Sequence, residues 1–427
     1  MQLSFAGLAA LVVAAATTAV EAVKPNPSAL MSANFGMIGR WGFNQASSMY
    51  TDDVTWEPSL YSFCQSTSYE VYHIGYVKAF RDANGYPGLH LGNHCYWPNN
   101  AFPNWKSDSE TGFYNLNCPS VASDIALCQN MGKKVMISFS PNDFIGNTTA
   151  DNGAVTAKQL WDLYLGGSSP YRPFGTVVLD GIDIHAWNND PNSYSDMIKT
   201  LRALMDASPR TFWLSGSPRC DYPDWTLGPN NGNRTDRILT TAPNAFDFLT
   251  PWMTASPNIC GFAGNNPSGF WTQLRVWNDL AASLGIPMFP GLPTWYVEAF
   301  DQAATGDYIN STVITNTTLV TQLKTLSQFR GVSLDDASYD RLNTPCIDTK
   351  LSYSHVWYRK LMNDSWTGCL SSGLEYSGKT LVGGGVSTTR RINTIQTSGS
   401  GYFRFAGQTS NTVLVALGLL AIGGLVF

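Results

Sequence analysis

Residues 177–187 read Val-Val-Leu-Asp-Gly-Ile-Asp-Ile-His-Ala-Trp, and this stretch decides the fold of the chain. Its apolar run contains two acidic residues, Asp180 and Asp183, three positions apart. Such a run is typical of a buried barrel strand whose carboxyl end enters a polar pocket. We therefore expect the residues that end the strand, His185 and Trp187, at the mouth of a site.

Strands and helices alternate over most of the remaining chain. Further strands are expected at 34–41, 69–80, 134–140, 212–220, 246–253, 286–293 and 329–336. Apolar residues at helical spacing predict helices at 155–165, 193–206 and 271–284. Eight alternations of strand and helix predict an α/β fold, the (β/α)8 TIM barrel, with its site at the carboxyl ends of the strands.

Asp180-Gly181-Ile182-Asp183 resembles the start of the Asp-Gly-x-Asp-x-Asp-x-Glu strand of glycoside hydrolase family 18, the chitinases and their non-catalytic relatives. The likeness covers residues 35–372 and is most similar to the fungal and plant class III chitinases in the first strand, the cysteine-containing loops and Gly291-Leu292-Pro293. It implies a disulfide-stabilised barrel with Asp180 and Asp183 pointing inward. In active relatives these aspartates tune the catalytic acid and orient the substrate's acetamido group.

The motif departs from the family pattern at its catalytic end. His185 stands where the family has its third Asp, and Trp187 stands where it has the catalytic Glu. The family mechanism needs a carboxylic acid to protonate the glycosidic oxygen while the acetamido carbonyl attacks the sugar. An indole N–H does not ionise near neutral pH, so Trp187 cannot act as this acid. The family's acetamido-binding Tyr is also missing from residues 252–255.

Aromatic residues near the expected strand ends form a candidate carbohydrate-binding surface. They are Trp41, Trp187, Trp252 and Trp295. Asp335 and Asp336 belong to the same candidate surface, since they end the eighth strand where class III chitinases place a sugar-binding Trp.

A structural alternative stands beside each of these assignments. The tryptophans are core residues in that alternative, and Asp180 forms a satisfied polar layer with Ser138. For His185, either an ion pair with Asp183 or contact with a ligand is expected.

Two classes of function follow from the altered motif. The first is a surface-anchored protein that is inactive as a chitinase and binds chitin or another cell-wall polysaccharide. The second is a divergent glycosidase or transglycosylase that recruits Asp335, Asp336 or Glu298 as its acid. A third class, less favoured, is an inhibitor or protein-binding relative that uses the outer loops and helices.

Both ends of the chain carry targeting signals. Residues 1–22 have an apolar core and end in small residues, as a secretory signal peptide does. The apolar tail 413–427 is shorter than the roughly 20 residues of a membrane span and matches a glycosylphosphatidylinositol (GPI) signal, with a transmembrane helix as the alternative. With attachment at Ser398, the organisation is 1–22 signal peptide, 23–372 barrel, 373–398 flexible Ser/Gly/Thr stalk and 399–427 removed GPI signal.

The 8 cysteines form an even number in a chain with a secretion signal, which predicts disulfides. No pair has Cys-x-x-Cys spacing, so these thiols are not expected to bind a metal. Class III chitinases bridge within the corresponding loops. The resemblance therefore implies Cys64 with Cys128, Cys95 with Cys118, and Cys220 with Cys260, which leaves Cys346 with Cys369.

Composition and sequons agree with the secretory pathway. Glycosylation is expected at Asn147, Asn233, Asn310, Asn316 and Asn363. A net charge of −5 with 13% charged residues leaves no basic stripe for nucleic acid. Gly92 between His90 and His94 argues against a helical metal pair. The sequence predicts a monomeric glycoprotein without cofactor or metal, secreted and held at the cell surface or cell wall by a lipid anchor.

Overall fold

Strand β5 (Gly181–Ile184) forms from the stretch that carries the altered motif and lies between strands β4 and β6. The computed structural model describes residues 25, 29–44, 46, 56–82, 84–95, 98–101, 116–141, 153–185, 191–230, 236–253, 257–262, 268–295, 308–316, 318–346, 351–368, 372–377 and 380–382. All of them belong to the first of two units, Met1–Ile395. The second unit, Gln396–Phe427, and the expected signal peptide lie outside the described residues.

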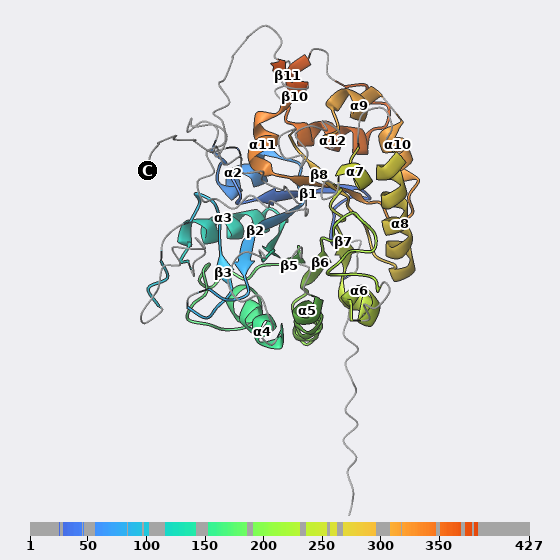
Figure 1. Cartoon of the computed structure of the whole chain (residues 1–427). Helices are drawn as coiled ribbons and strands as arrows, with labels where there is room; N and C mark the ends of the chain where they lie inside the picture. The colour runs from blue at the N-terminus through green and yellow to red at the C-terminus, as the bar shows by residue number, and fades with distance from the viewer. Residues whose placement is uncertain are drawn as a thin grey trace, which may run out of the picture. The chain divides into compact units, whose positions relative to one another are not determined.

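Parallel strands follow one another around the barrel in the order β7-β6-β5-β4-β2-β1-β9-β8 (Figure 1). Besides β5 they are β1 (Gly36–Trp41), β2 (Val71–Ala79), β4 (Lys134–Phe139), β6 (Trp213–Gly216), β7 (Phe248–Leu249), β8 (Gly291–Pro293) and β9 (Gly331–Asp335). The two ends of this path are joined, because Leu249 N donates to Pro287 O at 3.0 Å and Phe289 N donates to Leu249 O at 2.8 Å. The expected barrel is confirmed, and each strand lies inside its expected range.

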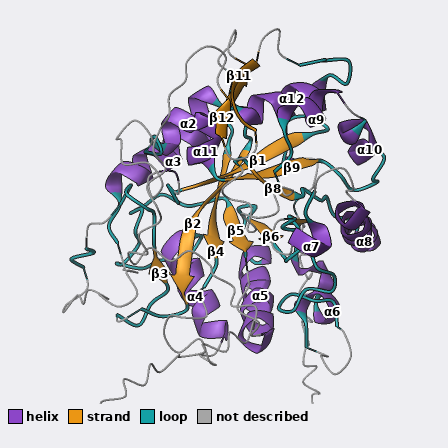
Figure 2. Ribbon diagram, turned by 45° about the horizontal axis from the view of Figure 1, so that its top comes forward, coloured by secondary structure: helices purple, strands orange, loops and turns teal. Residues whose placement is uncertain are grey.

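Helices cover the outside of the strands (Figure 2). The longer ones are α3 (Pro119–Asn130), α4 (Gly153–Tyr164), α5 (Pro191–Asp206), α8 (Ser268–Leu284) and α12 (Tyr353–Met362). Shorter helices are α2 (Leu60–Ser66), α6 (Ile238–Thr241), η3 (Pro243–Ala245), α7 (Pro257–Cys260), α9 (Ser311–Asn316), α10 (Leu319–Lys324) and α11 (Ala337–Leu342). Helix α8 buries Phe270, Leu274, Trp277 and Ala281, which recur on one helical face. The helices predicted from periodicity are thus confirmed as α4, α5 and α8.

The inward-facing side chains form layers, because residues on a strand alternate between its two faces. The layer at the amino-terminal end of the strands is an apolar cluster of Leu30, Met31, Ile38, Val71, Met136, Trp213, Phe248 and Phe289. Two residues further along the strands, the buried layer is polar and contains Arg40, His73, Ser138, Asp183, Ser215 and Thr250. The sequence pattern therefore places the polar residues toward the carboxyl ends, where a barrel carries its site.

Disulfides join the loops and helices outside the barrel. Bridges link Cys64 with Cys128, Cys95 with Cys118, and Cys220 with Cys260. These three pairings agree with those implied by the family resemblance. Cys346 is also disulfide-bonded, and its expected partner Cys369 lies outside the described residues.

A small antiparallel sheet follows the barrel. It consists of β10 (Thr344–Cys346), β11 (Ser372–Ser377) and β12 (Thr380–Val382), while the short β3 (Gly88–Leu89) pairs with β2 elsewhere. Leu374 of β11 pairs with Thr344 of β10. Strand pairing thus continues past Gly373, the residue at which the flexible stalk was expected to start. Among the described residues, no helix is both long and apolar enough to span a membrane.

Candidate functional site

A buried ion pair occupies the interior of the barrel. Arg40 from β1 reaches across to Asp183 from β5, with Nη1 3.3 Å from Oδ2 and both side chains fully buried. Ser138 Oγ donates to Asp183 Oδ2 at 2.8 Å. Ser215 Oγ and Ser217 Oγ donate to Oδ1 at 2.8 and 2.6 Å. Both carboxylate oxygens are therefore engaged by the protein itself.

The electrostatics of this network hold Asp183 as an anion. Burial alone would raise the pKa of Asp183, but the Arg40 guanidinium and the hydrogen bond from Ser217 oppose burial, and that pKa lies well below its usual range. Burial also lowers the pKa of His73 to about 4, so His73 is neutral at neutral pH. Arg40 is then the charge that keeps Asp183 ionised, and a proton donor is not available at this carboxyl.

His185 lies directly above the ion pair, beside Trp252. Arg40 Nη1 is 3.3 Å from His185 Nδ1, and because Arg can only donate, Nδ1 accepts and the ring proton sits on Nε2. Burial lowers the pKa of His185 well below its usual value, so the ring is neutral at neutral pH. The Arg40 guanidinium also lies 4.9 Å from the centre of the Trp252 ring, which covers the charge with an aromatic face.

Asp180 lies outside the barrel interior, contrary to expectation. It accepts hydrogen bonds from Val135 N at 2.8 Å and Gln129 Nε2 at 2.9 Å and pairs with Arg210 at 3.1 Å. Residues three apart on a strand point to opposite faces, so Asp180 and Asp183 cannot both face inward. The expected Asp180 pair with Ser138 is therefore wrong, and Asp183 is the partner of that serine.

The tryptophans expected to form a stacking surface are buried where the structure describes them. Trp41 is 0% exposed, Trp295 2% and Trp252 4%. Trp41 Nε1 donates to Pro58 O at 2.9 Å, its ring stacks on His94, and Trp295 stacks on Tyr339. Trp187 and Glu298 lie outside the described residues. The described members of the set are core residues and offer no open face to a sugar.

Asp335 and Asp336 end β9 next to each other but differ in role. Asp336 caps helix α11, since its carboxyl accepts from Tyr339 N at 3.1 Å and from Ser338 Oγ at 2.6 Å. Asp335 is 6% exposed, and its Oδ1 has no hydrogen-bond partner among the described residues. Burial raises the pKa of Asp335 to about 8, with Asp336 adding to the shift and Arg40 opposing it. Asp335 therefore holds a proton at neutral pH.

Two ionisable residues of the interior, Arg40 and Glu57, were missed by sequence reasoning. Arg40 replaces the Tyr of the first-strand Tyr-Trp-Gly-Gln-Asn pattern, and that substitution was the available signal. Glu57 lies in a loop with no motif, yet it is buried, and its Oε2 is 2.9 Å from His94 Nε2. Burial raises the pKa of Glu57 well above its usual value, and nearby Asp336 adds to this.

Within the described part of the chain, no three His, Cys, Asp or Glu side chains gather as a metal site would require. His94 instead packs between Glu57 and Trp41.

Comparison with known proteins gives a consistent set of relatives. No family model matches the chain. An acidic endochitinase of Beta vulgaris is 30% identical over 289 residues, which cover 66% of this chain and 84% of the relative. A chitinase-like protein of Schizosaccharomyces pombe is 30% identical over 262 residues, 60% of this chain and 19% of the relative. An endochitinase of Saccharomyces cerevisiae is 28% identical over 309 residues, 72% of this chain and 47% of the relative. The chain thus spans less than half of the length of these two yeast relatives.

Solved structures share the fold. A chitinase from Ipomoea carnea aligns with a TM-score of 0.54 at 23% identity, over 71% of this chain and 96% of that one. A xylanase and α-amylase inhibitor protein in complex with trehalose gives 0.54 at 22% identity, over 78% and 100%. A tamarind chitinase-like lectin gives 0.50 at 20% identity, over 76% and 98%.

The buried ion pair predicts a large loss of stability when one partner is removed. Asp183→Ala leaves the Arg40 guanidinium buried without its counter-charge, which costs about 3 to 5 kcal/mol of unfolding free energy. The control is Lys158→Ala, which breaks a surface pair whose lysine is 57% exposed and costs about 1 kcal/mol or less. Urea denaturation with intact disulfides measures both. Equal losses of unfolding free energy in the two variants would contradict the account. Recovery of the lost stability in the double variant Arg40→Met and Asp183→Leu would support it.

Asp335 predicts a loss of stability as the pH rises. Its pKa of about 8 in the folded protein lies above that of an unfolded Asp, about 3.9, so folding favours the protonated form. The stabilisation is full below the lower value and disappears as the pH rises through the higher one. Between pH 5 and 8 we expect the wild type to lose stability relative to Asp335→Asn, which cannot ionise. Asp236→Asn, at a 42% exposed carboxyl, is the control for removing one carboxyl from the surface. If the stability of Asp335→Asn followed the wild type across this pH range, the raised pKa of Asp335 would be refuted.

Proposed function

The chain belongs to glycoside hydrolase family 18, the chitinases and chitinase-like proteins, and on that premise we propose that it binds cell-wall carbohydrate without hydrolysing chitin. One observation carries the proposal. The family's acid position is Trp187, and the remaining inward carboxylate of the motif, Asp183, is locked to Arg40 and three serines. A glycosidase of this type needs a carboxyl that can give up a proton next to the leaving oxygen. Neither motif position supplies one.

The interior chemistry supports the loss of hydrolysis further. His185 replaces the third Asp of the motif and is neutral beside Arg40, so it cannot share a proton with a neighbouring acid in the way a carboxyl pair does. Trp252 lies over Arg40 near where relatives carry the acetamido-binding Tyr. Solved proteins with this fold include a chitinase-like lectin and an inhibitor protein crystallised with trehalose, so the fold also occurs in proteins not named as chitinases.

A divergent glycosidase is the second candidate, and one observation favours it. Asp335 holds a proton at neutral pH and ends a barrel strand, which are two properties of a general acid. Its distance from the motif strand would require a carboxylate geometry different from that of the family.

We expect no turnover of chitin oligomers by the unmodified protein. Loss of a general acid commonly reduces the rate by a factor of about 10² to 10⁴, and the missing Tyr removes support for the acetamido attack. Labelled chitohexaose incubated with purified protein and followed by mass spectrometry measures this, with an active class III chitinase as positive control. Trp187→Glu alone should also stay inactive, because Arg40 and His185 leave the new acid untuned. Robust cleavage by the wild type would overturn the proposal, and cleavage abolished by Asp335→Asn would establish the second candidate.

Location at the cell surface is part of the proposal. The signal peptide, the GPI signal with attachment at Ser398 and the sequons are sequence features that support it. Asn363 is exposed at the end of helix α12, so its side chain is accessible for glycosylation. We propose a glycoprotein tethered outside the membrane by lipid.

Phosphatidylinositol-specific phospholipase should release the protein from intact cells into the medium, because a GPI anchor is its point of attachment. Retention on cells that release a control GPI protein would favour the transmembrane alternative.

A further inference from the structure

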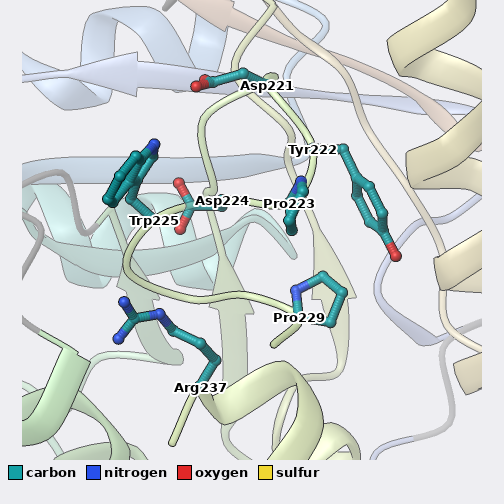
Figure 3. A pocket seen from close by; sticks show the side chains of 7 residues that line it. All are labelled: Asp221, Tyr222, Pro223, Asp224, Trp225, Pro229 and Arg237. Carbon is teal, nitrogen blue, oxygen red and sulfur yellow. The ribbon is translucent and has the colours of Figure 1, made fainter. Parts of the chain in front are cut away.

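An exposed aromatic residue lines a hollow on the loop between β6 and α6. In the described part of the chain the exposed tryptophans are Trp225, at 48%, and Trp56, at 45%. Trp225 borders a hollow of ≈ 260 Å³ together with Asp221, Tyr222, Asp224, Pro229 and Arg237 (Figure 3). We infer that this hollow, with the Trp225 indole as its platform, binds a sugar ring of a neutral oligosaccharide. The inference rests on the proposed carbohydrate-binding function and places it outside the barrel interior.

Hydrogen bonds within the loop hold its conformation without a ligand. The buried Asp224 carboxyl accepts from the backbone N–H groups of Thr226, Leu227 and Arg219 at 2.9, 2.5 and 3.1 Å. The backbones of Asp224 and Gly228 exchange hydrogen bonds of 3.1 and 3.2 Å. Gly228 has a φ of +103°, and a Cβ there would approach Arg237 Cβ to 2.5 Å, so glycine is required. A loop fixed in this way loses little conformational freedom when it binds.

The same loop is tied to the body of the barrel. Cys220 is bridged to Cys260, and its carbonyl accepts from Trp277 Nε1 of helix α8 at 2.7 Å. Tyr222 N donates to Gln273 Oε1 on the same helix at 3.1 Å. These contacts fix the position of the loop that carries the exposed Trp225.

The chemistry around the hollow suits a sugar ring. An indole face packs against the C–H face of a pyranose, while polar groups at the edge bind its hydroxyls. Asp221, paired with Arg219 at 3.2 Å, offers carboxylate acceptors. Arg237, which also lines the hollow, is buried and lies 3.3 Å from Asp236. Charges of both signs line the hollow, which favours a neutral ligand that uses hydrogen bonds.

The position of the loop agrees with this role. It leaves the carboxyl end of β6, the end at which barrels of this type carry their binding loops. Its first residues lie next to the strand end that carries Trp252, since Arg219 and Trp252 form a parallel bridge. An oligosaccharide lying on the rim of the barrel would therefore meet Trp225 without entering the space filled by Arg40 and Asp183.

The test measures binding of chitohexaose and of a β-1,3-glucan hexamer by calorimetry. All proteins carry Asn233→Gln, which removes the sequon nearest in sequence to this loop. Trp225→Ala should weaken binding about tenfold or more, whereas Trp225→Tyr, which keeps an aromatic face, should stay within about threefold. Trp56→Ala, at the other exposed tryptophan, is the matched control and should bind as the parent does.

Each outcome decides a different point. Equal binding by the parent and Trp225→Ala would overturn this inference and leave carbohydrate binding standing. Binding of neither oligosaccharide by the parent would overturn both the proposed function and the site. Circular dichroism melting of each variant checks the fold, and Asp221→Asn, which keeps the shape of the loop, should weaken binding severalfold without changing the melting temperature.

Discussion

The ion pair between Arg40 and Asp183 is the constraint on which the barrel interior depends. Two charges removed from water are tolerated only when their mutual attraction and further hydrogen bonds offset the lost hydration. The barrel meets this demand with serines on the neighbouring strands, all aimed at one carboxylate. The strand registers that bring these serines to Asp183 are therefore as important to the fold as the apolar layer beneath them.

This arrangement supports the proposed absence of chitin hydrolysis. Arg40 holds Asp183 as an anion, so this carboxylate cannot donate a proton. The neutral His185 and Trp252 lie beside Arg40 and fill the space in which active relatives tune the catalytic acid. In the proposed function, this polar core takes the place of family 18 chemistry. Asp335, the protonated carboxyl that ends β9, and Glu57, whose pKa burial raises well above its usual value, each have a buried oxygen without a hydrogen bond to a described residue.

The sequence predicted the barrel well because strand alternation and family motifs are local patterns. Every strand of the barrel fell inside its expected range, and three of the disulfides implied by the resemblance are confirmed. The site was predicted less well. The two-residue period of a strand would have separated Asp180 from Asp183, but the family motif was followed instead. Nearness to a strand end does not reveal whether a tryptophan is open, so buried Trp41 was included and exposed Trp225 was not. Arg40 and Asp183 meet only through the closed barrel, which no local pattern shows.

The most direct test of the account is a crystal structure of the protein soaked with chitotetraose. The account predicts sugar density on the rim at Trp225, with the Arg40 guanidinium still paired to Asp183 and the barrel interior free of ligand. A sugar ring seated inside the barrel, with Arg40 displaced and the acetamido group in contact with Asp183, would contradict it.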